Sequence, residues 1–388
     1  MKLVFFSNYL NHHQVLVADE FYRLLGDDFR FVATLPVNEK ELKGGVDYSK
    51  RSYCILPSEK DEACRMAFSL AREADTCVFG ACSQEFAVER AKHNPKGLSF
   101  EMGERWLKHG LLTIGSPVFR KWILNYIRYF RKANFHKLCC SSFAASDDAK
   151  LCAYVGRHYK WGYFTNVEKK SVETCSKDAV TKGKVRILWC ARFLLLKHPE
   201  LAVHLAARLK ADGYDFVVDM YGDEGNLAPH DKTYSRVNLE NLITKLEVKD
   251  CVNLKGSQSN AEILKAMREG DIFLFTSDRL EGWGAVANES MANGCVLVAS
   301  DAIGSTGYLV EHKVTGLKFC SCNLNSLYEQ VKFLLDNSEE MRRIACNGRK
   351  LMEELWNPAN AAKSLLQLIY DLNDSKVTNI LNGPCSKA

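Results

Sequence analysis

The stretch "DIFLFTSDRLEGWGAVANESMANGCVLVAS" (residues 271–300) indicates how this chain folds. An apolar run opens it, a polar loop with two glycines and a segment of small residues follow, and a second apolar run closes it. Short apolar runs separated by helix-length segments are typical of parallel strands that helices cover on both faces. The stretch therefore predicts a strand, a loop, a helix and a second strand.

The same alternation recurs in both halves of the chain. Apolar runs in the first half lie at 2–6, 30–34, 53–56, 76–79 and 137–140. Those in the second half lie at 185–190, 215–222, 251–254, 271–275 and 295–300. We predict an α/β protein with two doubly wound, Rossmann-like domains, at 1–167 and 185–356, that face a cleft.

The segments between and after these domains have different compositions. Residues 168–184 are polar and charged without an apolar period, which predicts a linker. Near the end of the sequence, Asn357 as N-cap and Pro358 at the first helical position begin an apolar stripe. We expect a helix there that crosses back to the first domain, and a loose tail in the remainder of 357–388.

Composition excludes several classes of protein. Lys and Arg number 52 against 47 Asp and Glu, and a net charge of +5 is too small to indicate nucleic-acid binding. The fifteen cysteines show no CxxC spacing, so we expect reduced thiols rather than a zinc site or a disulfide framework. No apolar run approaches the ~18 residues of a membrane span. We predict a cytoplasmic protein.

Two acids, Glu281 and Glu289, lie eight positions apart in the opening stretch. Glu281 follows a strand, at the sheet edge where open α/β sheets bind ligands. Gly282 and Gly284 allow close approach of the backbone, and the helix that follows presents unpaired N–H groups. If all eight residues were helical, the acids would lie roughly 12 Å apart along the axis. The alternative for Glu289 alone is a solvated surface acid.

A pair of cations follows another strand at the same predicted edge. Arg192 comes directly after the strand at 185–190, and Lys197 stands two residues before Pro199, where an amphipathic helix is expected to begin. Two cations at such a junction can hold a diphosphate and neutralise its charge as it leaves. An exposed Arg and Lys without a role is the alternative.

Three segments carry a resemblance to a known family: "CARFLLLKHPELAVHLAARL" (190–209), "YGDEGNL" (221–227) and 281–317. They resemble the retaining, group 1 (GT4-type) glycosyltransferases of the GT-B fold, which carry two glutamates eight positions apart, as at Glu281 and Glu289. The resemblance implies that the second domain binds a nucleoside-diphosphate sugar and that the first binds the acceptor. No metal and no cofactor are implied.

The resemblance also assigns roles to single residues. Glu281 is implied to contact the donor sugar and Glu289 the ribose, while the backbone amides of Gly282, Trp283 and Gly284 contact the donor. Arg192 and Lys197 match the cations that bind the diphosphate and replace a metal ion. Catalytic roles are thus expected for Glu281, Arg192 and Lys197, in a transfer that retains the anomeric configuration.

The first domain departs from this pattern, because "SNYLNHHQ" (7–14) stands where relatives have a glycine-rich loop. No GxGxxG follows the first strand either, which excludes a dinucleotide-dependent dehydrogenase. Asn11, His12 and His13 follow that strand and are candidates for contact with the acceptor, although histidines in such positions also serve structural roles. Glu101, Glu104 and Arg105 are further acceptor-side residues, or an exposed helix face.

Residues 105–137 are rich in basic and aromatic side chains and contain no acid. Such a mixture on a helix suits an anionic membrane surface, and a core helix with a solvated basic edge is the alternative. We predict peripheral docking on the inner face of the membrane, where the acceptor would be a glycan or a lipid-linked glycan of surface polysaccharide or glycolipid assembly.

Two other functions are compatible with the same segments. One is a GT-B protein that uses a nucleotide sugar in other chemistry, such as an epimerase or a phosphorylase. The other is a regulatory subunit that binds the nucleotide sugar without turnover. The sequence identifies neither the base, the sugar nor the acceptor.

Overall fold

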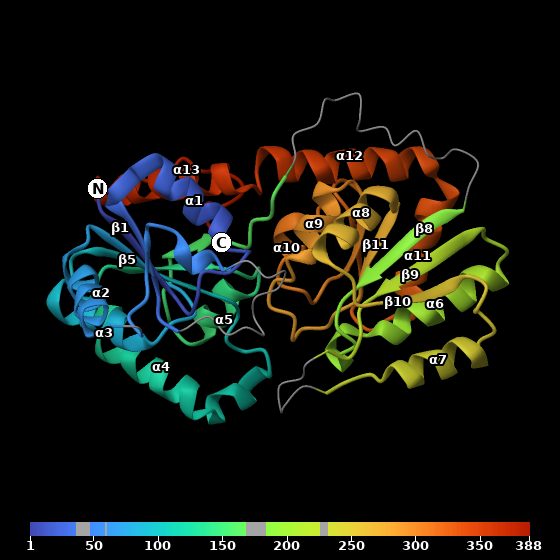
Figure 1. The fold of residues 1–388 in the computed structure, drawn as a ribbon, viewed down its shortest axis with the longest axis horizontal. Helices are drawn as coiled ribbons and strands as arrows, with labels where there is room; N and C mark the ends of the chain where they lie inside the picture. Colours follow the sequence, from blue (N-terminus) through green and yellow to red (C-terminus); the bar gives the residue numbers. More distant parts are fainter. Residues whose placement is uncertain (36–46, 59, 168–183, 226–231) are drawn as a thin grey trace. The chain divides into compact units, whose positions relative to one another are not determined.

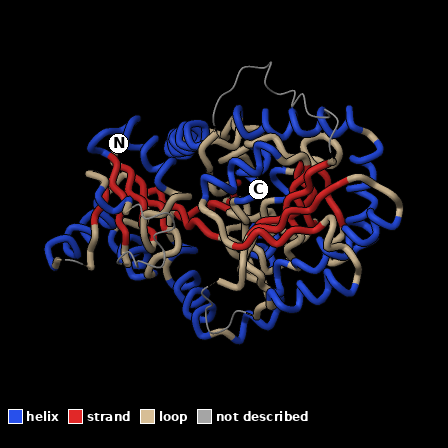
Figure 2. Tube along the Cα trace, turned by 45° about the vertical axis from the view of Figure 1, so that its right-hand side comes forward, coloured by secondary structure: helices blue, strands red, loops and turns tan. Residues whose placement is uncertain are grey.

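The computed structural model describes residues 1–35, 47–58, 60–167, 184–225 and 232–388. The predicted linker, 168–184, lies outside these ranges except for Lys184. The chain divides into two compact units, which we call unit 1 (Met1–Asn166 with Leu355–Ala388) and unit 2 (Val167–Glu354) (Figure 1). In each unit a layer of strands lies between helices (Figure 2).

Unit 1 contains a seven-stranded sheet with the order β3-β2-β1-β4-β5-β6-β7. All of its pairings are parallel. Its strands are Leu3–Ser7 (β1), Phe29–Ala33 (β2), Cys54–Ile55 (β3), Thr76–Phe79 (β4), Leu98–Gly103 (β5), Phe135–Cys139 (β6) and His158–Lys160 (β7). Its helices are Val15–Leu25 (α1), Asp61–Glu73 (α2), Gln84–His93 (α3), Pro117–Arg128 (α4), Ala144–Lys150 (α5) and Pro358–Asn373 (α13).

Unit 2 contains a six-stranded parallel sheet with the order β10-β9-β8-β11-β12-β13. Its strands are Val185–Cys190 (β8), Phe216–Tyr221 (β9), Val252–Gly256 (β10), Ile272–Phe275 (β11), Val296–Ser300 (β12) and Leu317–Phe319 (β13). Its helices are Pro199–Ala211 (α6), Arg236–Lys245 (α7), Asn260–Glu269 (α8), Val286–Ala292 (α9), Thr306–Leu309 (α10), Leu324–Asp336 (α11) and Ser338–Glu354 (α12).

The central strands of both sheets are apolar because helices cover both of their faces. Every residue of β1, β4, β11 and β12 is buried. The strand order reverses beside the first strand of each unit, between β1 and β4 and between β8 and β11. Loops that leave the carboxyl ends of strands on either side of such a switch point diverge and leave room for a ligand. Each unit therefore has one favoured binding position.

Helix α13 returns the chain to unit 1, as the sequence predicted, and it packs against α1 (Figure 1). Its N-terminus is built as expected, because the Asn357 side chain accepts a hydrogen bond from the Asn360 amide and Pro358 occupies the first turn. The prediction of a loose tail is wrong at its end. Cys385 and Ser386 are buried and exchange backbone hydrogen bonds with Lys160 at the end of β7.

The predicted strands are all present, and three further strands were missed. Strands β7 and β13 have only three residues each, too few for a periodic signal. Strand β5 contains polar residues, including Glu101, which had been assigned to an exposed helix face as one alternative. In the described part of the chain the cysteines are all free, and no helix there is long and apolar enough to cross a bilayer.

Candidate active site

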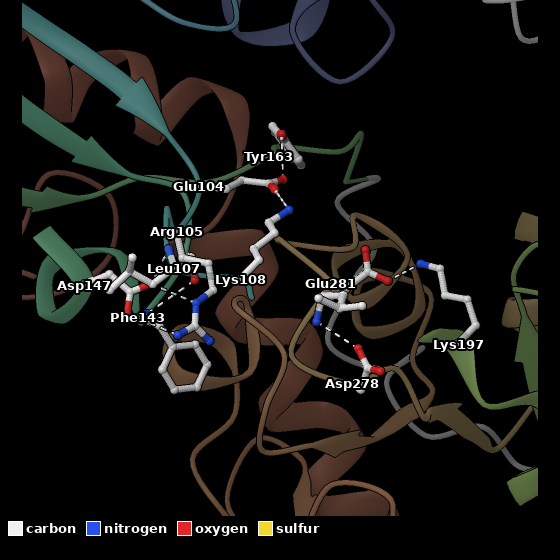
Figure 3. A network of polar contacts seen from close by, with 12 residues as sticks. Glu104, Arg105, Leu107, Lys108, Phe143, Asp147, Tyr163, Lys197, Asp278 and Glu281 are labelled. Carbon is white, nitrogen blue, oxygen red and sulfur yellow. Dashed lines mark hydrogen bonds and ion pairs between the residues drawn. The ribbon is translucent and has the colours of Figure 1, made fainter. Parts of the chain in front are cut away.

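Glu281 and Lys197 form an ion pair at the switch point of unit 2. Lys197 ends the short 3-10 helix Leu195–Lys197 (η7), which follows β8, and Glu281 lies in the loop that follows β11. Ser277 also donates a hydrogen bond to the Glu281 carboxylate, over 3.1 Å. Figure 3 shows that carboxylate directed at the Lys197 ammonium group. Two residues predicted to act on the donor are thus brought together, although 84 positions separate them.

Hydrogen bonds to β8 and to the β11 loop hold the loop that carries Lys197 in place. Trp189 in β8 donates to the Thr276 hydroxyl over 2.8 Å, and that hydroxyl donates to the Lys197 carbonyl over 2.6 Å. The Asp278 amide donates to the Leu196 carbonyl. Because the β8 and β11 loops are joined in this way, the backbone that supports the ion pair has little freedom.

His198 is a residue of this site that the sequence did not reveal. Its ring contacts Glu200 through Nδ1 at 2.9 Å and Asp278 through Nε2 at 3.3 Å. The hydrogen bonds that the ring donates to Asp278 and Glu200 raise the pKa of His198 to about 10, against an ordinary value of 6.5. Burial raises the pKa of Asp278, but the hydrogen bonds from His198 and the Leu280 amide, together with the charges of His198 and Arg279, leave the pKa below its usual range. An imidazolium therefore stands beside Lys197 at neutral pH.

The glycine turn after Glu281 depends on close backbone packing. Gly284 has φ +75°, and a Cβ atom there would lie 2.1 Å from the ring of Phe275. The indole of the adjacent Trp283 is buried and donates to Asn288 over 2.8 Å. The side chain of Trp283 is thus part of the core, and its backbone, with that of Gly282, forms the turn.

Glu289 lies in the first turn of α9 and is partly exposed. Helix α9 begins at Val286, so the assumption that residues 281–289 are all helical is wrong. The glycine turn replaces the first helical turn because Gly284 adopts a left-handed conformation. Glu281 therefore belongs to the loop, and Glu289 to the helix.

Arg192 lies on the neighbouring loop, between β8 and η7, and is exposed. Its side chain runs close to Gly225, where a Cβ atom would meet Arg192 Cδ at 3.3 Å. Gly222 is packed still more closely, because a Cβ atom there would lie 1.9 Å from the Ala191 carbonyl. Of the segment 221–227 singled out in the sequence, the described residues 221–225 therefore place the β9 loop against the β8 loop.

Unit 1 has a cavity of about 750 Å³ at its own switch point. Its wall includes residues that follow β1, β4, β5 and β6, among them Gln14, Gly80, Trp106 and Cys140. This wall contains several aromatic rings and a few polar groups, as is usual in ligand sites of this size. No single stretch of the sequence indicates this cavity, because its residues come from four separate loops.

The three acceptor-side candidates lie beside this cavity rather than at its centre. The Asn11 side chain accepts from the amides of His13 and Gln14, at 2.9 and 3.1 Å, and so shapes the turn before α1. The rings of His12 and His13 are 3.7 Å apart, and His13 stacks on Tyr163, which lines the cavity. Asn11 therefore has a structural role here, and the two histidines support the wall.

Glu104, Lys108 and Tyr163 form a chain of polar contacts along the same wall (Figure 3). Lys108 donates to Glu104 over 2.6 Å, and the Tyr163 hydroxyl donates to the other oxygen over 3.2 Å. Arg105, which had been grouped with Glu104, instead pairs with the buried Asp147 at 3.0 Å. The alternative of an exposed helix face for these residues is wrong, because Arg105 and Glu104 follow a strand.

Glu101 is held more tightly than any other acid of this wall. It accepts hydrogen bonds from Lys137 at 2.6 Å, Trp122 at 3.0 Å and Tyr154 at 2.6 Å. Burial alone would lower the pKa of Lys137, but the charges of Glu101 and Asp148 raise it above its usual range. Lys137 is therefore charged although its side chain is fully buried.

The basic stretch 105–137 divides into an inner and an outer part. Its large aromatic residues Trp122, Tyr126 and Phe130 belong to the core, so the prediction that they contribute to a membrane surface is wrong. Arg105, Lys108 and Lys137 are paired with acids of unit 1. The outer part is instead aliphatic and basic, and its exposed aliphatic residues are Leu111, Leu112, Ile114, Val118, Leu124 and Ile127.

Comparison with known proteins agrees with the arrangement in unit 2. The family model described as "Glycosyl transferases group 1" matches residues 173–351, which is most of that unit. Residues 173–351 of this chain are therefore similar to this family. A curated relative, the amylovoran biosynthesis glycosyltransferase AmsK of Erwinia amylovora, is 30% identical over 213 residues, which are 53% of this chain and 49% of AmsK. The chain thus spans about half the length of this relative.

Solved structures show a likeness in fold that covers both units of the chain. Anabaena Alr3699/HepE, crystallised in complex with UDP, has a TM-score of 0.67 at 16% identity, over 97% of this chain and 100% of that one. The lipopolysaccharide outer core galactosyltransferase WaaB in its apo form has a TM-score of 0.66 at 13% identity, over 96% and 100% of the two chains. Both support a GT-B-like fold with two parallel α/β sheets.

Proposed function

We propose that this protein transfers a sugar from a nucleoside-diphosphate sugar to a glycan acceptor, with retention of the anomeric configuration. The observation that carries the proposal is the pairing of Glu281 with Lys197 at the switch point of unit 2, inside the segment that matches the family. HepE, a protein of the same fold, binds UDP, and AmsK takes part in amylovoran biosynthesis. A nucleotide-sugar donor and a polysaccharide or glycolipid acceptor are the corresponding proposals here.

In this proposal the cations of unit 2 receive the diphosphate of the donor. Lys197 and Glu281 are 17% and 13% exposed, so a bound diphosphate can reach the ammonium group and compete for it. Arg192, on the same β8 loop as Lys197, supplies a second cation, and the charged His198 adds to the positive potential. Fixed cations near a leaving diphosphate stabilise the charge that develops on it.

The transfer step then needs no other base. The acceptor hydroxyl forms a bond to the anomeric carbon while the bond to the diphosphate breaks on the same face. The hydroxyl proton passes to the departing phosphate oxygen, so the products are the glycosylated acceptor and the nucleoside diphosphate. We assign Glu281 to the hydroxyls of the donor sugar and Glu289 to the ribose, with the backbone of Gly282, Trp283 and Gly284 completing the donor site.

A screen of nucleotides tests the donor site directly. Thermal unfolding and calorimetry are measured with UDP, GDP, ADP, CMP and their common sugar conjugates, without added metal. A ligand at 100 times its Kd stabilises the protein by about 2.7 kcal/mol. We expect one diphosphate family to stabilise the protein, E289A to lose that effect, and E329A, which removes an exposed acid of α11, to keep it.

If none of these nucleotides bound to the folded protein or stabilised it, the proposal would be contradicted. That result would favour a regulatory subunit, the second candidate kept from the sequence. Binding without transfer to any acceptor would instead favour an epimerase or a phosphorylase, and the fate of the donor sugar would distinguish these two.

We also propose that unit 1 docks on an anionic membrane, which would bring it to a lipid-linked acceptor. The docking surface consists of the short 3-10 helix Gly110–Gly115 (η4) and the outer side of α4 with the turn after it. Leu112 is 85% exposed and Leu124 is 65% exposed. Removal of a leucine side chain from water is favourable, so these two side chains would gain from contact with an apolar partner. The basic residues exposed around them are Arg120, Lys121, Arg128, Arg131 and Lys132.

The two faces of α4 explain how it can be both a core helix and a docking helix. Phe119, Trp122 and Tyr126 lie on the inner face and are buried. Leu124 and Arg128 lie one helical turn apart on the opposite face and are exposed. Cations near an anionic membrane contribute about 1 kcal/mol each, so five of them give substantial attraction.

Flotation with lipid vesicles tests the docking surface. We expect binding to vesicles that contain anionic lipid, weak binding to neutral vesicles, and a loss of binding in the triple variant R128Q/R131Q/K132Q. A matched variant, K245Q/K249Q/K265Q, removes three exposed cations from unit 2 and should bind as the native protein does. Equal binding to neutral and anionic vesicles would overturn this part of the proposal.

A further inference from the structure

The cavity of unit 1 contains two buried polar atoms that have no hydrogen-bond partner among the described residues. They are Oε1 of Gln14, an acceptor, and Nε1 of Trp106, a donor. Both residues line the cavity of about 750 Å³. A buried polar group without a partner destabilises the folded state, so native proteins rarely leave one without water or a ligand. These two atoms point to a polar occupant.

The rest of the wall limits the kind of occupant. The Trp106 ring lies 4.5 Å from the Trp122 ring, centroid to centroid, and Tyr163 and Phe79 also line the cavity. Glu101 and Lys137 neutralise one another, and so do Glu104 and Lys108. The occupant therefore meets aromatic surface and a few hydrogen-bonding groups, with little net charge at the inner wall.

We infer that this cavity binds a sugar residue of the acceptor, with Gln14 and Trp106 as its hydrogen-bonding partners. A sugar hydroxyl both donates and accepts, so it can satisfy the carbonyl oxygen of Gln14 and the indole N–H of Trp106. The C–H surface of the ring packs on the aromatic side chains.

The position of Gln14 supports this assignment. The other side-chain atom of its amide, Nε2, donates to the Ser7 hydroxyl at the end of β1, over 3.1 Å. That hydrogen bond fixes the side chain at the switch point and determines which amide atom remains unpaired. Trp106 is fixed as well, because its ring also packs edge-on against Phe119 at 5.5 Å. Both partners are thus held in place before the sugar binds.

One lysine connects this cavity to the docking surface. Lys121 on α4 is exposed and lines the cavity, as does Val118. A glycan that enters the cavity from the membrane passes this cation, which can contact a phosphate that links the glycan to its lipid. This inference rests on the proposed function, because it identifies the acceptor side of the same transfer.

Saturation-transfer NMR on the full chain tests the sugar site without turnover. The probes are the methyl α- and β-glycosides of glucose, galactose and N-acetylglucosamine, with maltose and lactose as disaccharides. We expect at least one of them to receive saturation from the native protein, and Q14M and W106F each to lose at least tenfold in affinity. W161F, which alters a buried tryptophan of unit 1 outside the cavity wall, should bind the probe normally.

The outcomes separate this inference from the proposed function. Donor binding by calorimetry should be unchanged in Q14M and W106F, because both changes lie in unit 1, and circular dichroism establishes that both variants are folded. If the donor binds and no probe sugar does, the inference is wrong and the proposed function stands. If a probe binds equally well to W106F and the native protein, the assignment of Trp106 is wrong. Sugar binding without any donor binding would support the cavity and contradict the transferase.

Discussion

A lysine and a glutamate form an ion pair in each unit of this molecule, and the surroundings of the two pairs differ. In unit 1, Lys137 and Glu101 lie on adjacent strands, and Trp122 and Tyr154 also donate to the glutamate. In unit 2, Lys197 and Glu281 lie on loops, where both side chains are partly exposed. A fully bonded pair with a buried lysine inside a sheet stabilises the fold, whereas a pair on loops can exchange partners with a ligand.

The largest effect is expected where the glutamate of the unit 1 pair is removed. In E101A the Lys137 ammonium group would be buried without its counter-ion, and we expect a loss of about 3–5 kcal/mol in the free energy of unfolding. Urea denaturation measures it. The double variant E101Q/K137M removes both charges and keeps an acceptor for Trp122 and Tyr154, so it should be more stable than E101A. A loss below about 1 kcal/mol in E101A would remove the distinction between the two pairs.

Removal of the glutamate of the unit 2 pair should act on turnover instead. We expect E281A to lower kcat by roughly 10²–10³-fold, because a contact that strengthens in the transition state is lost. Lys197 is 17% exposed whereas Lys137 is 0% exposed, so water can solvate the ammonium group that remains and the free energy of unfolding should change less than in E101A. Initial rates of sugar transfer, with urea denaturation as the control, measure both. A near-normal kcat would show that Glu281 lacks the role proposed for it.

A third variant, G284A, tests the backbone packing of the glycine turn in unit 2 without changing any charge. Gly284 and Gly213 have φ angles of +75° and +79°, but only Gly284 is closely packed, against Phe275. Alanine at Gly213 should cost about 1–2 kcal/mol through its left-handed conformation alone. Alanine at Gly284 should cost roughly 1–3 kcal/mol more, because it must displace the ring. Equal losses of stability in G284A and G213A would mean that the glycine turn is loosely packed.

The smallest effect concerns His198, whose pKa is higher in the folded protein than in the unfolded chain. Its stabilising contribution is complete below pH 6.5 and is lost as the pH rises towards 10. After allowance for solvent screening, we expect the native protein to lose roughly 1–2 kcal/mol more than H198N between pH 6.5 and 10. Asparagine tolerates the left-handed backbone of position 198. Parallel pH dependences of unfolding for the two proteins would contradict this.

The part of the site that could be predicted is local in sequence. Glu281, Arg192 and Lys197 each follow an apolar strand, so their position at one sheet edge follows from the parallel topology. The contacts of His198 with Asp278, and of Gly284 with Phe275, could not be predicted, because they depend on how two loops pack. In unit 1 the role of Glu101 could not be predicted, because β5 contains polar residues and lacks the apolar pattern of a buried strand. A charged residue in such a segment is normally assigned to the surface when its partners are unknown.

The return of the chain to unit 1 has a consequence for how the protein folds during its synthesis. Helix α13 packs on α1, and residues 385–388 pair with β7, but the whole of unit 2 lies between them in sequence. The ribosome therefore releases every strand of unit 1 long before the segment that completes it. Unit 2 is continuous and can fold as soon as it emerges, so the half of the molecule that is made first is finished last.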